Sequence, residues 1–131
     1  MITYSILTLK EAIAFLEKHK SWKESIELLD TTKKTITVAI SKNGVVIGIA
    51  SAIIFTKTAR IRTLYVLKDY RKQTFGSKLI KVLISCLKEI ETIDRVTTFA
   101  TPLGVSPFEK NGFKKIHKRK INKDTYMEVI L

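Results

Sequence analysis

The sequence predicts one mixed α/β domain over residues 1–131, with its elements in the order βααβββαβαββ. One observation is the pair Asn43-Gly44 between two apolar runs, a strong hairpin signal because both residues tolerate a positive φ. Another is an amphipathic stretch, residues 75–90, between two strand-like runs, because a helical crossover joins parallel strands. A sheet that holds both a hairpin and a parallel pair is mixed.

Seven runs have the alternation or the β-branched and aromatic content that is typical of strands. They cover residues 2–8, 35–42, 45–55, 60–67, 95–101, 113–121 and 125–131. The helix that follows the fourth run is marked by apolar residues on one face, namely Phe75, Leu79, Leu83, Cys86 or Leu87, and Ile90.

Three capping boxes, each a Ser or Thr three residues before a Glu, predict where the other helices begin. They start at Thr8, Ser21 and Ser106. The second helix is expected to end at Leu29. The third has proline at its first helical position and is expected to end at Asn111-Gly112, within two turns.

The composition favours a compact cytoplasmic protein. Of the residues, 45% are hydrophobic and 27% charged, and no apolar run approaches the roughly 20 residues that span a bilayer. The first residues lack the features of a secretory signal. The single cysteine, Cys86, forms neither an internal disulfide nor a cysteine-built zinc site, and its place on an apolar helix face predicts a core residue. We expect no metal site.

The net charge of +12 is unevenly distributed. Residues 1–30 carry four Lys and five acidic residues, whereas the segment Lys110–Lys123 holds seven cations and no acid. Such a basic surface predicts an anionic partner: nucleic acid, anionic lipid or a polyphosphate small molecule. A solvated, lysine-rich surface without a partner is the alternative.

The stretch YRKQTFGSKLI, residues 70–80, joins a strand to a helix and has the parts of an anion site. A helix N-terminus leaves about four backbone N–H groups without a partner and carries a partial positive charge. Arg71 and Lys72 add charge, Gly76 allows close approach, and Ser77 offers a hydroxyl. The alternative is a plain strand-to-helix turn. Neither G-x-x-x-x-G-K-[ST] nor G-x-G-x-x-G occurs here.

Two motifs resemble the GNAT superfamily of N-acetyltransferases. LYVLKDYRKQTFGSKLI is similar to that family's strand ending L-x-V followed by R/Q-x-x-G-x-G/A at a helix start, and FEKNGFKKI is similar to Y-E-K-x-G-F. Arg71 and Gly76 match the first pattern, but Thr74 occupies its first glycine position, and Phe108 stands where the family usually has Tyr. The motifs cover residues 60–118, and the order of elements covers the whole chain.

The resemblance implies acetyl-CoA as cosubstrate. Its pyrophosphate would lie on backbone amides flanked by Arg71 and Lys72, namely those of Gln73, Thr74, Phe75, Gly76 and Ser77. Its pantetheine arm would pair with the preceding strand at Leu64, Tyr65 and Val66, and Phe108 would pack against it. Thr74 is compatible with a helix start if its φ stays negative.

The resemblance also implies transfer of an acetyl group to a primary amine by direct attack. Family members often carry a Glu on the strand before the loop and use the motif Tyr as the acid, and this sequence has neither plainly. An Asn that often contacts the cofactor is missing from ATPLGVS. Tyr65 is the first candidate for a substitute, and Tyr126 and His117 are weaker ones.

Other functions stay open beside this one. The chain could transfer acetyl groups slowly through water, or bind CoA or an anionic partner such as nucleic acid without catalysis. Because the basic segment Lys110–Lys123 would repel a polyamine, it suits an acceptor with local negative charge. The family often dimerises through its closing strands, so a homodimer is compatible with the resemblance.

Overall fold

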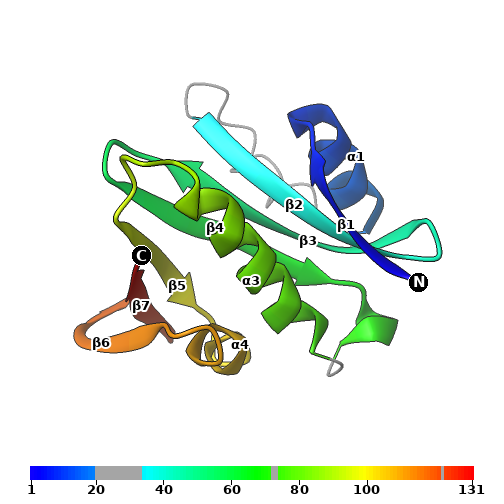
Figure 1. Cartoon of the computed structure of the whole chain (residues 1–131). Coiled ribbons are helices and arrows are strands. Elements are labelled where there is room, and N and C mark those ends of the chain that lie inside the picture. The colour runs from blue at the N-terminus through cyan, green and yellow to red at the C-terminus, as the bar shows by residue number, and fades with distance from the viewer. Residues whose placement is uncertain (20–33, 72–73, 122) are drawn as a thin grey trace.

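The computed structural model describes residues 1–19, 34–71, 74–121 and 123–131. These residues form a seven-stranded sheet in the order β1-β2-β3-β4-β5-β7-β6 (Figure 1). The strands are β1 (Ile2–Leu7), β2 (Lys34–Lys42), β3 (Val45–Ile54), β4 (Thr58–Val66), β5 (Arg95–Ala100), β6 (Lys114–Ile121) and β7 (Asp124–Ile130). The pair β4–β5 is parallel and the other neighbours are antiparallel, which confirms the predicted mixed sheet.

The described helices are α1 (Leu9–His19), the short 3₁₀ helix η1 (Lys68–Tyr70), α3 (Phe75–Lys88) and α4 (Val105–Glu109). The helix predicted from Ser21 to Leu29 lies outside the described residues. The capping box of α1 is confirmed, because the Thr8 N–H donates to Glu11 Oε1 at 3.0 Å and the Glu11 N–H donates to Thr8 Oγ1 at 3.2 Å. The hydrogen bond from the Thr8 backbone and, to a smaller extent, the one from the Thr8 side chain hold the pKa of the Glu11 carboxyl below its ordinary value.

The predicted hairpin is also confirmed. Asn43 has φ 51° and Gly44 has φ 82°, and the flanking strands β2 and β3 pair antiparallel. Two consecutive residues with positive φ give the kind of turn whose twist matches that of the strands, so the Asn-Gly pair was a sufficient local signal.

The predicted start of α4 is wrong, whereas its predicted end is confirmed. The helix is capped by Gly104, whose φ of −86° and ψ of −12° are already helical, and not by Ser106. The Gly104 N–H donates to the Thr101 carbonyl at 2.9 Å, so a preceding turn runs directly into the helix. At the other end Gly112 has φ 87°, and the N–H groups of Gly112 and Phe113 close a Schellman motif on Glu109 and Phe108.

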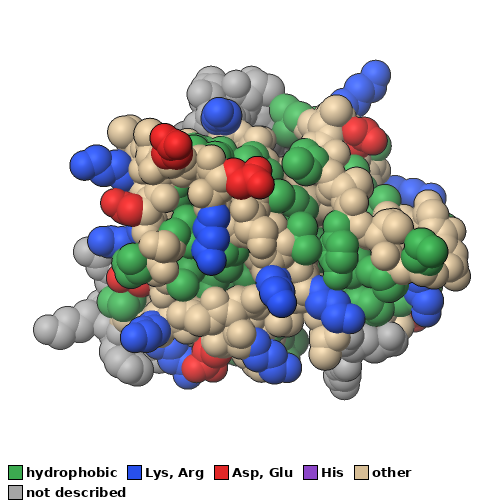
Figure 2. Space-filling model, in the orientation of Figure 1, with side chains coloured by type: hydrophobic (Ala, Val, Ile, Leu, Met, Phe, Trp, Pro, Cys, Tyr) green, Lys and Arg blue, Asp and Glu red, His purple; other side chains and the backbone are tan. Residues whose placement is uncertain are grey.

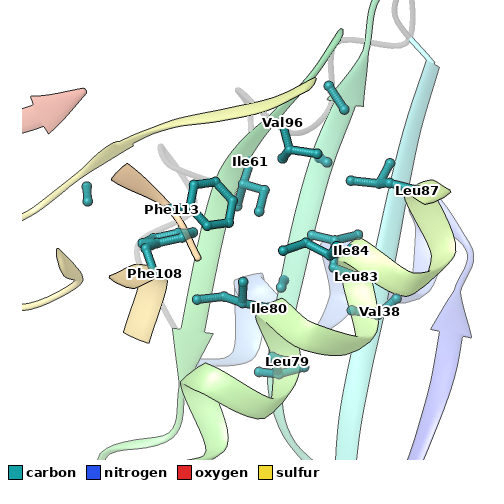
Figure 3. Close-up of a cluster of buried hydrophobic side chains, with 14 of the residues drawn as sticks. Val38, Ile61, Leu79, Ile80, Leu83, Ile84, Leu87, Val96, Phe108 and Phe113 are labelled. Atoms are coloured by element: carbon teal, nitrogen blue, oxygen red, sulfur yellow. The ribbon is translucent and has the colours of Figure 1, made fainter. Parts of the chain in front are cut away.

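Two clusters of apolar side chains cover the two faces of the sheet. On one face, the side chains of Ile80, Leu83, Ile84 and Leu87 on α3 point toward those of Val38, Ile61 and Val96, with Phe108 and Phe113 beside them (Figure 3). On the other face, Phe15 and Leu16 of α1 pack against Ala39 and Ile49. The half-buried Cys86 packs against the first cluster, and burial, with a smaller effect of Glu89, raises the pKa of its thiol.

Candidate active site

The parallel strands β4 and β5 separate partway along their length. Thr58–Ile61 pair with Arg95–Thr98, and within the described residues no β4 residue beyond Ile61 has a partner on β5. The Thr98 hydroxyl donates to the Ile61 carbonyl at 3.1 Å, at the end of the paired region. On its other side β4 stays paired with β3 as far as Val66, with a bulge at Arg62. The second half of β4 is therefore an open edge toward β5.

Two residues direct their backbone polar groups to this edge. The Leu67 N–H donates to the Ile47 carbonyl of β3 at 2.8 Å. Hydrogen-bonded and non-hydrogen-bonded pairs alternate along an antiparallel ladder. The backbone N–H and C=O groups of Tyr65 are therefore directed to β3, as those of Leu67 are, whereas those of Leu64 and Val66 are directed away from β3. Of the three residues predicted to pair with pantetheine, Leu64 and Val66 have the required backbone orientation.

The start of α3 lies at the open end of β4, after η1. By helix geometry its first four N–H groups, those of Thr74, Phe75, Gly76 and Ser77, lack acceptors within the helix, and the Lys78 N–H is the first to bond back, to the Thr74 carbonyl at 3.0 Å. These are four of the five predicted pyrophosphate amides. The fifth, that of Gln73, and the predicted cation Lys72 lie outside the described residues.

The backbone of Thr74 does not meet the condition stated for it. Thr74 caps α3 with φ 68° and ψ 0°, in the left-handed region, whereas threonine was considered compatible with this helix start if its φ stays negative. This conformation is strained for a β-branched residue and free for glycine. The turn from η1 into α3 therefore requires a left-handed residue at the position where the motif has its first glycine, and threonine adopts that geometry at a cost.

Gly76 leaves space beside the helix start. A Cβ built on Gly76 would lie 3.8 Å from Leu64 Cδ2 and 4.0 Å from Pro107 Cγ, which are ordinary contacts. Packing within the chain therefore does not demand glycine here, and the open space is available to a ligand.

Arg71 lies folded back on β4. Its Nε donates to the Val66 carbonyl oxygen at 2.9 Å, and its guanidinium carbon is 5.4 Å from the centroid of the Tyr65 ring. The sequence predicted that Arg71 adds charge to the anion site. In the structure, Arg71 is bonded to a carbonyl of the open edge.

Asn111 connects the two predicted motifs, a role that sequence reasoning missed. Its Nδ2 donates to the Ser77 carbonyl at 3.0 Å, the Ser77 hydroxyl oxygen at 3.1 Å and the Pro107 carbonyl at 2.9 Å. From the sequence, Asn111 was interpreted only as part of the Asn-Gly helix end. Its bridging role depends on α3 and α4 being neighbours. The Ser77 hydroxyl oxygen accepts the bond from Asn111 Nδ2, so its own proton is available to a ligand.

Tyr65, the first catalytic candidate, points to the face opposite α3. Its hydroxyl donates to the His19 carbonyl at 2.9 Å, and its ring meets that of Phe15 edge to face at 6.2 Å between centroids. Of the weaker candidates, Tyr126 is buried on β7 against Phe99, and the side chain of His117 lies outside the described part of the structure.

Phe108 belongs to the core. It is 3% exposed, and its ring centroid lies 5.0 Å from that of Phe113 in an edge-to-face arrangement. Its predicted contact with a cofactor stays a prediction, and its ring carries no hydroxyl for proton transfer.

The basic segment is exposed where it is described, at Lys110, Lys114, Lys115 and Lys123. On the α3 side of the molecule, Lys and Arg side chains are spread among hydrophobic and acidic ones and do not form one patch (Figure 2). No helix within the described ranges is long and apolar enough to cross a bilayer. Among the same residues, no group of three or more His, Cys, Asp or Glu side chains could hold a metal ion.

Comparison with solved structures gives the same fold throughout. The PaiA N-acetyltransferase of Thermoplasma acidophilum, solved with coenzyme A, is 17% identical with a TM-score of 0.76, over 100% of this chain and 99% of that one. The Escherichia coli GNAT family N-acetyltransferase YhbS, solved with CoA, is 15% identical with a TM-score of 0.76, over 98% and 81%. The Escherichia coli ribosomal-protein-S18-alanine N-acetyltransferase is 18% identical with a TM-score of 0.73, over 100% and 93%.

A search of curated proteins finds no match to this chain. Residues 3–127 match the family described as the acetyltransferase (GNAT) domain, which is nearly the whole length of the chain. Acetyl-CoA is the cosubstrate of that family. With its mixed sheet, its divided β4–β5 pair and its two motifs, the chain belongs to the GNAT acetyltransferase family.

Proposed function

We propose that this protein transfers the acetyl group of acetyl-CoA to a primary amine by direct attack of the amine on the thioester. The observation that carries the proposal is the open edge of β4 beside the amide-rich start of α3. An edge whose N–H and C=O groups have no partner strand suits the two amides of a pantetheine arm, and a helix start suits a pyrophosphate.

In this proposal the pyrophosphate lies on the amides of Gln73 and of the first residues of α3, which are Thr74, Phe75, Gly76 and Ser77. Lys72 and Arg71 supply positive charge. Arg71 lies 2.9 Å from the Val66 carbonyl, so it has to release that oxygen if pantetheine uses it. The Ser77 hydroxyl, oriented by Asn111, adds a donor.

The pantetheine arm then follows Leu64, Tyr65 and Val66, which places the thioester near the separation of β4 from β5. The neutral amine would attack the carbonyl carbon, a C–N bond would form and the C–S bond would break. The amine nitrogen would lose one proton to water, and the CoA thiolate would gain one from the proton donor. An unpaired β4 N–H directed to the edge can stabilise the oxyanion of the intermediate.

The proposed site lacks the family's usual proton donor. Phe108 stands where the family usually has Tyr and cannot donate. Tyr65 is our candidate, and its hydroxyl would have to turn from the His19 carbonyl, 2.9 Å away, toward the leaving sulfur. A missing acid or base costs roughly 10²- to 10⁴-fold in rate, so transfer through water would be slow.

The second candidate function is a domain that binds CoA or another anionic partner without catalysis. Two observations favour this second function. Phe108 is buried and has no hydroxyl, and the Tyr65 hydroxyl already donates to the His19 carbonyl. A gel shift with nucleic acid at low and high salt, with and without CoA, tests the anionic partner. Competition between CoA and nucleic acid would indicate that both use the loop at Arg71.

The test of cofactor binding is isothermal titration of acetyl-CoA into the wild-type protein, Gly76→Pro and Gly76→Ala. Pro at the second position of a helix is tolerated but removes the amide, whereas Ala keeps the amide and adds a Cβ. We expect micromolar binding that is lost in Gly76→Pro and weakened in Gly76→Ala, with circular dichroism confirming that each variant is folded. A wild-type protein that does not bind acetyl-CoA would contradict the proposed function.

A further inference from the structure

Arg60 on β4 lies on the sheet face opposite α3. Its neighbours Ala59 and Ile61 are buried in the cluster that packs against α3, and side chains alternate between faces along a strand. A guanidinium on this face lies beside the region where β4 and β5 separate, because Arg60 pairs with Thr97 and the next pair, Ile61 with Thr98, is the last.

The guanidinium of Arg60 is held in a defined orientation by β5. Its Nε donates to Thr97 Oγ1 at 3.4 Å, and its carbon lies 5.1 Å from the centroid of the Phe99 ring. Phe99 is the first β5 residue beyond the last pair with β4, and its ring packs 5.1 Å from that of the buried Tyr126. The face of the Phe99 ring and the Thr97 hydroxyl thus fix the planar guanidinium of Arg60 where β4 separates from β5.

Arg60 has no carboxylate partner among the described residues. The acid nearest in the sheet pairing is Glu128, the β7 partner of Thr97, and it forms an ion pair with Arg95, with 3.6 Å between Oε2 and Nη1. With Nε bonded to Thr97, the two terminal nitrogens of Arg60 retain four N–H donors in a fork. Such a fork matches the two oxygens of a carboxylate or a phosphate.

An acceptor amine has to reach the thioester from the face of Arg60. On the other face the sheet is covered by α3 and by the side chains of Ile61, Ile80 and Phe108 (Figure 3). An acceptor that approaches the end of the β4–β5 pairing from the face opposite α3 therefore passes the guanidinium.

We propose that Arg60 binds an anionic group, a carboxylate or a phosphate, that the acceptor carries in addition to its amine. This inference rests on the proposed acetyl transfer and names the chemical class of its acceptor. Arg62, exposed at the neighbouring bulge, adds positive charge on the same strand. The anionic group anchors the acceptor and leaves its neutral amine to attack the thioester carbon.

The test compares two pairs of amines that differ in the anionic group: O-phosphoethanolamine with ethanolamine, and L-alanine with L-alaninamide. The kcat/KM of each is measured by CoA release for the wild-type protein, Arg60→Gln and Arg60→Lys. The control is Lys81→Gln, which removes an exposed cation from α3 on the opposite face of the sheet and leaves the ion pair of Arg95 with Glu128 intact. The intrinsic reactivity of each amine cancels when variants are compared on the same amine.

We expect Arg60→Gln to lower kcat/KM for an anionic amine by roughly 10- to 100-fold, the range for a charge-assisted hydrogen bond, and to leave its neutral partner nearly unchanged. Arg60→Lys should recover part of the loss, and Lys81→Gln should act equally on both. Phosphoethanolamine and alanine separate a phosphate from a carboxylate as the preferred group.

Equal loss for anionic and neutral amines would overturn the inference, because it would place Arg60 at the oxyanion of the thioester. Where turnover is too slow to measure, the same amines are titrated into the protein saturated with CoA. A CoA-loaded protein that neither acetylates nor binds the anionic amines in preference to the neutral ones would also overturn the inference. Failure to bind acetyl-CoA at all would instead contradict the proposed function.

Discussion

The Nε of Arg71 lies 2.9 Å from the carbonyl oxygen of Val66, five residues earlier in the chain. The loop that would supply charge to the proposed pyrophosphate site therefore also occupies an acceptor on the open edge of β4. Arg71 accordingly has two opposite effects on the proposed cofactor, attraction of its phosphates and competition with its pantetheine arm.

Replacing Arg71 should separate these two effects. We expect Arg71→Ala to weaken CoA binding by roughly tenfold, because a charge-assisted contact to phosphate is lost. Binding of pantetheine, which has no phosphate, should be unchanged or tighter, since the Val66 carbonyl is released. Titration calorimetry of both ligands provides the measurement, and parallel losses for CoA and pantetheine would contradict the two-effect interpretation.

Thr74→Gly should stabilise the protein. The left-handed conformation at φ 68° costs a residue with a Cβ about 1–2 kcal/mol, and the greater freedom of glycine in the unfolded chain offsets about 0.5–1 kcal/mol of that. The expected gain in the free energy of unfolding is about 0.5–1 kcal/mol by urea denaturation. Thr74→Ala is the matched control, because it keeps the Cβ and should give no comparable gain. A destabilised Thr74→Gly variant would show that the strain is absent.

Asn111→Ala should weaken both stability and CoA binding. The side-chain amide bridges α3 and α4 through three carbonyl or hydroxyl oxygens at 2.9–3.1 Å, and its loss should cost about 1–2 kcal/mol. Asn111→Asp is the sharper variant, since it directs a carboxylate at three oxygen acceptors and should cost more. Thermal unfolding and acetyl-CoA titration report the two effects, and an Asp variant as stable as the wild type would contradict the bridging role.

Tyr65→Phe tests the proposed proton donor. If the hydroxyl protonates the leaving thiolate, kcat should fall roughly 10²- to 10⁴-fold with little change in the dissociation constant of acetyl-CoA. Loss of the bond to the His19 carbonyl should also lower stability by about 1 kcal/mol. His19 accepts through its backbone, so His19→Ala keeps that carbonyl and serves as the control for local packing. An unchanged kcat in Tyr65→Phe would leave proton transfer to water.

Glu11 should give the α1 terminus a pH-dependent contribution to stability. Its pKa is lowered by the hydrogen bonds from Thr8, so the stabilisation is present above the unfolded pKa and is lost as the pH falls through the lower folded pKa. Glu11→Gln keeps an oxygen acceptor without the charge. The difference in melting temperature between wild type and Glu11→Gln should therefore be larger at neutral pH than at pH values below the carboxyl titration, and a constant difference would exclude this effect.

The features that were predicted correctly are those set by neighbouring residues. The Asn43-Gly44 turn, the Thr8–Glu11 capping box and the helix end at Asn111-Gly112 each depend on a few consecutive residues. The parallel β4–β5 pair followed from the length of the crossover between them.

The errors and omissions have a different origin. The φ of Thr74 and the cap of α4 depend on the path of the preceding turn, which residue type alone does not determine. The contacts of Arg71 with Val66, of Asn111 with Ser77 and of Arg60 with Phe99 join separate elements, and they required the strand register and the placement of α3. The motifs indicated the location of the proposed cofactor loop but gave no information about how the surrounding side chains contact that loop.

The separation of β4 from β5 leaves a gap in the interior of the sheet. A pantetheine arm lying in that gap would act as a short additional strand, and the cosubstrate would then be a structural component as well as a reactant. Ligand that binds only the native state stabilises it by RT ln(1 + [L]/Kd), so the stability grows with the concentration of the ligand. The stability of this protein would consequently rise with the supply of acetyl-CoA, and where acetyl-CoA is scarce a larger fraction would be unfolded and open to proteolysis.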